Sequence, residues 1–203
     1  MVQKFWRVRL GAAKKGFDRF EKVFNLCKNE KPPCIAVGWG ELDLSKGIDE
    51  IEQDWNQDDD NLFGGIDAVQ IRRWVEMKKG DHVIAMIRPA TICAIGEIIR
   101  KRYYKKDKNF KFEIEGYKEG GEVRFFNRID VKWITNSDNY IKIKSLGLPK
   151  DLEAKLNIPL TIIELDSGNY NILKNKMDTF EPEEESSSPK YGRKYDTEGR
   201  AGR

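Results

Sequence analysis

The sequence predicts an α+β domain built on a small, strongly curved sheet or barrel of five or six strands, flanked by two or three helices. Three observations point to this class. Helical spacing of apolar residues is concentrated in the first half of the chain, and patterns typical of strands fill most of the second half. Hydrophobic residues make up 39% of the 203 residues, which is enough for one packed core.

The first half mixes strands and helices. Apolar residues alternate with arginines over 6–10, which predicts a strand. Phenylalanines recur at helical spacing within 12–28, which predicts an amphipathic helix whose lysines face water. A short apolar run at 35–37 predicts a second strand. The segment 49–60 is acidic and is expected to be irregular, whereas apolar residues within 71–75 predict a second helix.

The second half is expected to form most of the sheet. Residues 82–87 are almost continuously apolar, as in a strand buried on both faces, and 91–99 is the expected hairpin partner. Apolar and charged residues alternate over 110–115, and the strand pattern continues over 123–133. A short helix over 151–156 and a last strand over 160–165 complete the expected elements.

The ordered domain is expected to span residues 1–176. Beyond it, acidic residues at 181–185 and serines at 186–188 are followed by few bulky side chains. Such a stretch cannot bury enough apolar surface to offset the entropy lost on ordering it. Residues 177–203 are therefore predicted to be a disordered linker or tail.

Composition excludes several classes of protein. No stretch approaches the run of about 18–20 apolar residues that a membrane-spanning helix needs. The three cysteines are odd in number and widely spaced, which suits buried thiols in a reducing cytoplasm. A single histidine offers little for a histidine-dependent triad or a metal site, and the glycine patterns of nucleotide-binding loops are absent. We expect a cytoplasmic binding domain without catalytic residues, cofactor or membrane partner.

Trp39 is the aromatic residue best placed to bind a ligand. It lies between Gly38 and Gly40 just after a predicted strand, where glycine lets a ligand approach the backbone closely. Its ring can stack on a flat ligand, or it can cover the end of the sheet as part of the core. The other tryptophans in phase with apolar neighbours, which are expected in the core, are Trp6, Trp74 and Trp133.

A basic run at 100–108 interleaves six cations with two tyrosines. Cations neutralise phosphates and release counterions, and tyrosine rings stack on bases, so this composition suits nucleic acid. A solvated hairpin tip that protects a sheet edge would have the same composition. The candidate phosphate-binding residues are Arg9, Lys14, Lys15, Arg100, Lys101, Arg102, Lys105 and Lys106.

Several segments, taken in order, resemble PUA-like domains, in particular their EVE and YTH branches. Met-Lys-Lys-Gly-Asp-His-Val-Ile at 77–84, followed by Ala-Ile-Gly-Glu-Ile at 94–98, is similar to the core motif of these domains. Ile-Ala-Val-Gly-Trp at 35–39 is similar to the segment that delivers the first cage tryptophan of YTH domains, and 126–134 is similar to one of their later strands. The resemblance covers residues 4–165.

The resemblance implies a reader of a modified base. In YTH domains N6-methyladenine is held between aromatic rings, and Trp39 matches the first position of that cage. The candidates for the second cage position are Phe112, Tyr117 and Trp55. The acidic insertion at 49–60 departs from the YTH pattern, as does Gly-Ala-Ala at 11–13, where YTH domains have an asparagine pair.

The charge-rich composition is typical of heat-adapted surfaces. Together with the trailing linker, it makes the chain similar to the N-terminal modules of archaeal McrB-type proteins, which belong to modification-dependent restriction systems. That resemblance implies a domain that flips a methylated base out of DNA, N6-methyladenine being favoured and 5-methylcytosine next. The implied partners are a GTPase motor domain in the full-length protein and a nuclease subunit.

Three alternatives stay open at this point. A PUA-like domain can instead read structured or modified RNA. An enzyme with the ASCH arrangement would hydrolyse a modified nucleoside with an acid–base pair, for which Glu97 and Lys101 are the nearby candidates. A module that binds only other proteins is the third alternative.

Overall fold

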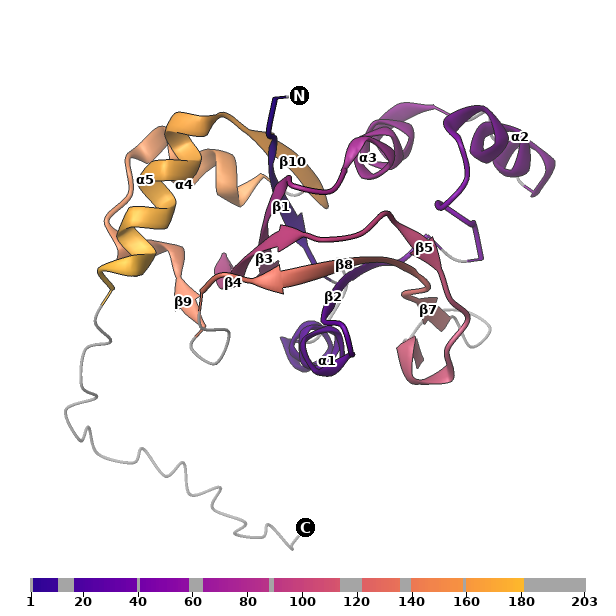
Figure 1. Ribbon diagram of the computed structural model, residues 1–203, viewed down its shortest axis with the longest axis horizontal. Coiled ribbons are helices and arrows are strands. Elements are labelled where there is room, and N and C mark those ends of the chain that lie inside the picture. Colours follow the sequence, from indigo (N-terminus) through magenta and orange to yellow (C-terminus); the bar gives the residue numbers. More distant parts are fainter. Residues whose placement is uncertain are drawn as a thin grey trace, which may run out of the picture.

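The computed structural model describes residues 2–10, 17–39, 41–58, 64–87, 90–113, 122–135, 140–158 and 160–180. These residues form an α+β domain, as the sequence predicts, with helices packed around a mixed sheet (Figure 1). In this part of the chain the strand order runs from one edge to another and does not close into a barrel.

The strands are short, and most pair with an antiparallel neighbour. They are β1 (Phe5–Arg9), β2 (Cys34–Val37), β3 (His82–Ile87), β4 (Thr91–Ile98), β5 (Tyr103–Tyr104), β6 (Lys111–Glu113), β7 (Glu122–Arg124), β8 (Asn127–Trp133), β9 (Ile141–Lys142) and β10 (Ile162–Leu165). The main sheet has the order β10-β1-β3-β4-β8-β2, with β5 paired to β8 and β9 to β4, while β6 and β7 form a separate ribbon. Only the pairing of β1 with β3 is parallel among the described strands.

Five α-helices lie in the described residues, and they cover two separate cores. They are α1 (Phe17–Asn29), α2 (Ile48–Asp58), α3 (Gly65–Glu76), α4 (Lys150–Asn157) and α5 (Ser167–Asp178). On β3, Val83 and Ala85 join a larger core with residues of α1, α2 and α3, whereas Ile84 and Met86 join a second core with residues of α4 and α5. Because both faces of β3 are covered, its sequence is continuously apolar rather than alternating.

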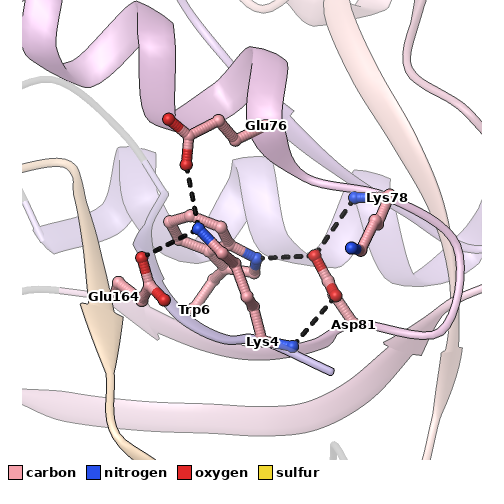
Figure 2. Close-up of polar contacts among 6 residues, drawn as sticks. All are labelled: Lys4, Trp6, Glu76, Lys78, Asp81 and Glu164. Atoms are coloured by element: carbon pink, nitrogen blue, oxygen red, sulfur yellow. Dashed lines mark hydrogen bonds and ion pairs between the residues drawn. The ribbon is translucent and has the colours of Figure 1, made fainter. Parts of the chain in front are cut away.

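Asp81 fastens the N-terminal strand to the turn that precedes β3 (Figure 2). Its buried carboxylate accepts hydrogen bonds from the indole N–H of Trp6 at 2.9 Å, from the backbone N–H of Lys4 at 3.0 Å and from that of Lys78 at 3.2 Å. Gly80 has a φ of 89°, a left-handed conformation that glycine adopts readily. The Gly-Asp pair of the motif at 77–84 therefore has a structural role in this chain.

Two helices differ from the sequence-based expectation. α2 occupies most of the segment 49–60, for which the acidic composition suggests no regular structure. Its apolar residues Ile48, Ile51 and Trp55 are three and four apart and pack on the larger core. α5 has no counterpart among the expected elements, although it also buries residues at helical spacing along one side.

The remaining differences concern boundaries and short strands. The helix expected over 12–28 is α1, and residues 11–16 lie outside the described part of the chain. The strand pattern expected over 123–133 is divided between β7 and β8, and the two-residue strands β5 and β9 were too short to anticipate. α5 continues to Asp178, two residues beyond the expected domain boundary, and residues 181–203 are not among those described.

The prediction of buried thiols is confirmed, because all three cysteines are free and buried. No helix within the described ranges is both long enough and apolar enough to cross a membrane.

Candidate nucleic-acid interface

Trp39 lies on a loop at the end of β2. Val37 is the last buried residue of the strand, Gly38 is exposed, and the half-buried ring of Trp39 packs against the larger core. The backbone N–H of Leu42 donates to the carbonyl of Trp39 at 3.2 Å and closes a turn. Trp39 therefore stabilises the end of the sheet while the residue stays partly exposed.

Asn127, the first residue of β8, holds this loop in place. It is fully buried and pairs with Val37 across the sheet. Its side-chain oxygen accepts from the N–H of Leu44 at 2.8 Å, and its amide nitrogen donates to the carbonyl of Leu42 at 2.9 Å. A buried asparagine in a strand costs stability unless both ends of its amide are bonded, and here both are.

Glu41 connects the Trp39 loop to the basic residues. Its two carboxylate oxygens accept from Lys106 at 2.9 Å and from Arg124 of β7 at 2.6 Å. The hydrogen bond and positive charge of Lys106, with the charge of Arg124, lower the pKa of the Glu41 carboxyl. The segment after β5 and the β6–β7 ribbon consequently meet within two residues of Trp39.

The structure describes the surroundings of the predicted cage residues only in part. Phe112 lies on β6 and pairs with Val123 of β7, so its backbone belongs to the ribbon that reaches Glu41. The structure does not describe the side chain of Phe112. Tyr117 lies outside the described residues. Trp55 is half-buried in α2 and packs on the larger core. The identity of the second cage residue, opposite Trp39, stays a prediction.

Several of the predicted phosphate-binding residues lie in the segment 100–106, which runs beside β8. Arg100, Lys101 and Lys105 border a pocket of about 590 Å³. Beyond the pocket, β5 pairs with Arg128 and Asn127 of β8, and Lys106 then reaches Glu41. The basic segment therefore extends from the pocket to the Trp39 loop.

Arg9 and Arg102, also predicted to bind phosphate, make hydrogen bonds inside the protein. Arg102 donates to three backbone carbonyls, those of Leu44 at 2.7 Å, Lys46 at 2.9 Å and Val75 at 2.9 Å. Burial lowers the pKa of its guanidinium. Arg9 is only 7% exposed and donates to a carbonyl of α4 at 3.5 Å. Lys14 and Lys15 lie outside the described residues.

Buried polar residues of β8 lie beside this basic segment. They were not among the site residues predicted from the sequence. Arg128 is fully buried, stacks over the ring of Phe110 at 3.6 Å and pairs with Asp107 at 3.2 Å. Asp130 is 3% exposed and borders the pocket. The available signal was the interruption of an apolar strand pattern by Asn127, Arg128 and Asp130, since polar groups on a buried strand need specific partners.

The structure does not assemble the acid–base pair of the hydrolase alternative at this pocket. Lys101 lines it, whereas Glu97 is not among its lining residues and instead pairs with His82 and Lys132 within the sheet.

A sequence profile described as a domain of unknown function (DUF8426) matches residues 6–160. No curated protein is significantly similar in sequence to the chain.

Several solved structures are similar in fold. The human THYN1 protein in complex with DNA containing 5-methylcytosine is 12% identical, with a TM-score of 0.48, over 89% of this chain and 100% of that one. Rpa0253 from Rhodopseudomonas palustris is 12% identical, with a TM-score of 0.45, over 88% and 95%. The YTH domain of the Zygosaccharomyces rouxii MRB1 protein, in complex with N6-methyladenosine RNA, is 11% identical, with a TM-score of 0.43, over 86% and 87%. Likenesses of this degree assign no function to the chain.

Proposed function

The chain belongs to the family described as a domain of unknown function (DUF8426), and we propose that its function is to bind nucleic acid that carries a methylated base. The observation that carries this proposal is the position of the partly exposed Trp39 on a loop tied through Glu41 to Lys106 and Arg124. A stacking surface and cations for the nucleic-acid backbone thereby lie within reach of the same ligand.

The energetics of such a site are consistent with base flipping. A base inside a duplex must be turned out before it can stack on Trp39, at a cost of a few kcal/mol. Stacking on an aromatic ring contributes about 1–3 kcal/mol per base, and phosphate contacts add affinity that does not depend on sequence. Burial of one methyl group contributes at most about 0.8 kcal/mol. Useful discrimination therefore requires a second surface that closes the site around the methyl group.

We propose DNA as the nucleic acid, with N6-methyladenine preferred over 5-methylcytosine. The sequence resemblance to YTH domains at 35–39 and 126–134 supports the preference for methyladenine. The domain would serve as the specificity module of a modification-dependent restriction system. It would itself be non-catalytic, and a GTPase motor domain and a nuclease subunit would perform the later steps.

Matched duplexes test this function. Binding of the chain to duplexes that differ in one N6-methyladenine is measured across a series of salt concentrations, with 5-methylcytosine duplexes and RNA of the same sequence in parallel. We expect the methylated DNA to bind most tightly. Equal affinities for methylated and unmethylated DNA would end the modified-base proposal, and stronger binding of the RNA would reassign the domain to RNA.

Trp39→Ala is expected to abolish the preference for the methylated duplex while the dependence of affinity on salt stays nearly unchanged, because the ring contributes stacking and no charge. Trp39→Phe, which keeps an aromatic ring, is the matched control and should retain part of the preference. Thermal unfolding of each variant checks the fold. A changed salt dependence with discrimination preserved would assign Trp39 to backbone contacts or to the core.

A further inference from the structure

The pocket beside β8 is separate from the Trp39 loop. It opens where β2 begins, next to the pairing of Cys34 with Asp130, whereas Trp39 follows the other end of β2. Strands rise about 3.3 Å per residue, so the five residues from Cys34 to Trp39 separate the two places by roughly 16 Å. A base stacked on Trp39 therefore does not occupy the pocket.

The wall of this pocket contains the buried carboxylate of Asp130, and one of its two oxygens lacks a hydrogen-bond partner among the described residues. Asp130 is 3% exposed, and its Oδ1 atom has no hydrogen-bond partner among the described residues. Its Oδ2 atom lies 3.5 Å from the guanidinium of Arg100. A buried carboxylate oxygen left unbonded is costly, and a ligand that donates an N–H to it would remove that cost.

The rim of the pocket is basic. Lys31 and Lys101 are exposed, and the side chains of Arg100 and Lys105 are 70% and 52% exposed. These four cations outnumber the two carboxylates that line the pocket, those of Glu30 and Asp130. The rim consequently suits an anionic group, and phosphate is the anion that lysine and arginine bind in nucleic-acid interfaces.

Tyr103 supplies a flat wall. It is half-buried, lines the pocket and pairs through its backbone with Arg128 of β8. Burial raises the pKa of the Tyr103 hydroxyl, and its hydrogen bond to Asp130 and the charge of that carboxylate raise it further, so the ring stays neutral at physiological pH. A neutral aromatic wall beside a basic rim is the combination on which nucleobases stack.

We propose that this pocket binds a guanine nucleotide, with the base donating to Asp130 and the phosphate lying among Lys31, Arg100 and Lys101. Guanine presents two adjacent N–H donors on one edge, which a carboxylate can accept together. Adenine and cytosine each place an acceptor nitrogen beside their amino group, and that nitrogen would repel the carboxylate. The cavity of about 590 Å³ is within the size range of small-ligand sites.

The nucleotide has two possible sources, which share this chemistry. It can be an unpaired guanine of the bound nucleic acid, in which case the inference rests on the proposed function and adds sequence preference to it. It can also be a free nucleotide. A guanine paired with cytosine does not qualify, because pairing uses the same two N–H groups.

Titration of the chain with guanosine and adenosine 5′-monophosphate tests the pocket directly by calorimetry. We expect the guanosine nucleotide to bind at least about tenfold more tightly, the discrimination typical of paired hydrogen bonds to one base edge. Equal affinities for the two nucleotides on the unmodified chain would overturn the inference, and this result does not depend on any variant.

Asp130→Asn distinguishes recognition from charge. The substitution removes one negative charge, so a purely electrostatic pocket would bind both nucleotides more tightly and keep their ratio. Recognition by the carboxylate predicts instead that the guanosine preference disappears while adenosine monophosphate binds as well as before or better. A preference that survives in a folded Asp130→Asn chain would overturn the inference.

The source is settled with a methylated duplex that bears a single-stranded extension containing either guanine or adenine. Dependence of affinity on that base, lost in Asp130→Asn, assigns the pocket to the bound strand. Discrimination among free nucleotides without such dependence assigns it to a free nucleotide. The same duplexes with and without methylation measure the preference for the methyl group. That measurement tests the proposed function, and its outcome does not depend on the result for the pocket.

Discussion

At the residue scale, His82 is the clearest example of a side chain whose chemistry is set by its packing. Its Nδ1 atom lies 2.6 Å from the hydroxyl of Tyr170, whose ring stacks on Phe5 with centroids 4.2 Å apart. Burial lowers the pKa of His82 below its ordinary value of 6.5, although the charges of Glu97 and Asp81 act in the opposite direction. The residue therefore belongs to a small structural cluster at the edge of the second core.

We expect the proton titration of His82 to have its midpoint below pH 6.5 in the folded chain. As the pH falls, the unfolded state therefore takes up the proton before the folded state does. The contribution of His82 to the free energy of unfolding is complete above pH 6.5, and it is lost between pH 6.5 and the lower pKa of the folded state. The chain has one histidine, so its ring signals in a proton NMR titration report this residue alone.

Urea unfolding at pH 7.5 and 5.5 checks the linked change in stability. His82→Gln is the control, because it cannot titrate and should lose this part of the pH dependence. A midpoint at or above pH 6.5 in the folded chain would show that the neighbouring carboxylates, rather than burial, determine the charge of the imidazole.

At the element scale, the sequence predicted the elements that consist of long apolar runs and did not predict those with few apolar residues. The strands β3 and β4 follow directly from their apolar runs, because such runs are stable only when buried on both faces. α2 and α5 each bury only a few apolar residues among many polar ones. Helices of that kind are held mainly by tertiary packing, so their local pattern is weak.

Arg102 links several of these elements, and its removal should affect stability without affecting binding. Its three hydrogen bonds hold the loop before α2 and the end of α3 against the segment leading to β5. Arg102→Met leaves three carbonyls without this donor, and we expect the free energy of unfolding in urea to fall by about 2 kcal/mol. Affinity for unmethylated DNA, measured at a temperature where both chains are folded, should change less than twofold.

Lys101→Met is the matched control for that substitution, because Lys101 is exposed and lines the pocket. It should weaken DNA binding and reduce its salt dependence, with unfolding unchanged. If Arg102→Met instead weakened DNA binding as much as Lys101→Met while stability held, the original assignment of Arg102 to phosphate would be restored.

At the scale of the whole molecule, the position of Trp39 after a strand could be predicted, whereas the surroundings of the site could not. The pocket gathers residues from the segment after α1, from β5 and the residues around it, and from β8, which are far apart in sequence. The role of Glu41 likewise depends on Lys106 and Arg124 reaching it from separate segments. Such assemblies follow from sheet topology, which local periodicity does not determine.

The same assembly implies that the interface is partly neutralised before nucleic acid binds. Glu41 holds Lys106 at 2.9 Å and Arg124 at 2.6 Å, so a phosphate must compete with this carboxylate for both cations. We therefore expect Glu41→Gln to bind DNA several-fold more tightly at low salt, and the slope of log affinity against log salt to become steeper by up to about 0.9 for each cation released.

Asp178→Asn is the charge-matched control for Glu41→Gln. Asp178 pairs with Lys174 on α5, which lies at the opposite end of the molecule from β5 and β7 (Figure 1). Both variants raise the net charge by one, but screening confines the effect of a distant charge at physiological salt, so only Glu41→Gln should change the slope. Equal effects of the two variants would mean that net charge, rather than competition at the Trp39 loop, governs the encounter with DNA.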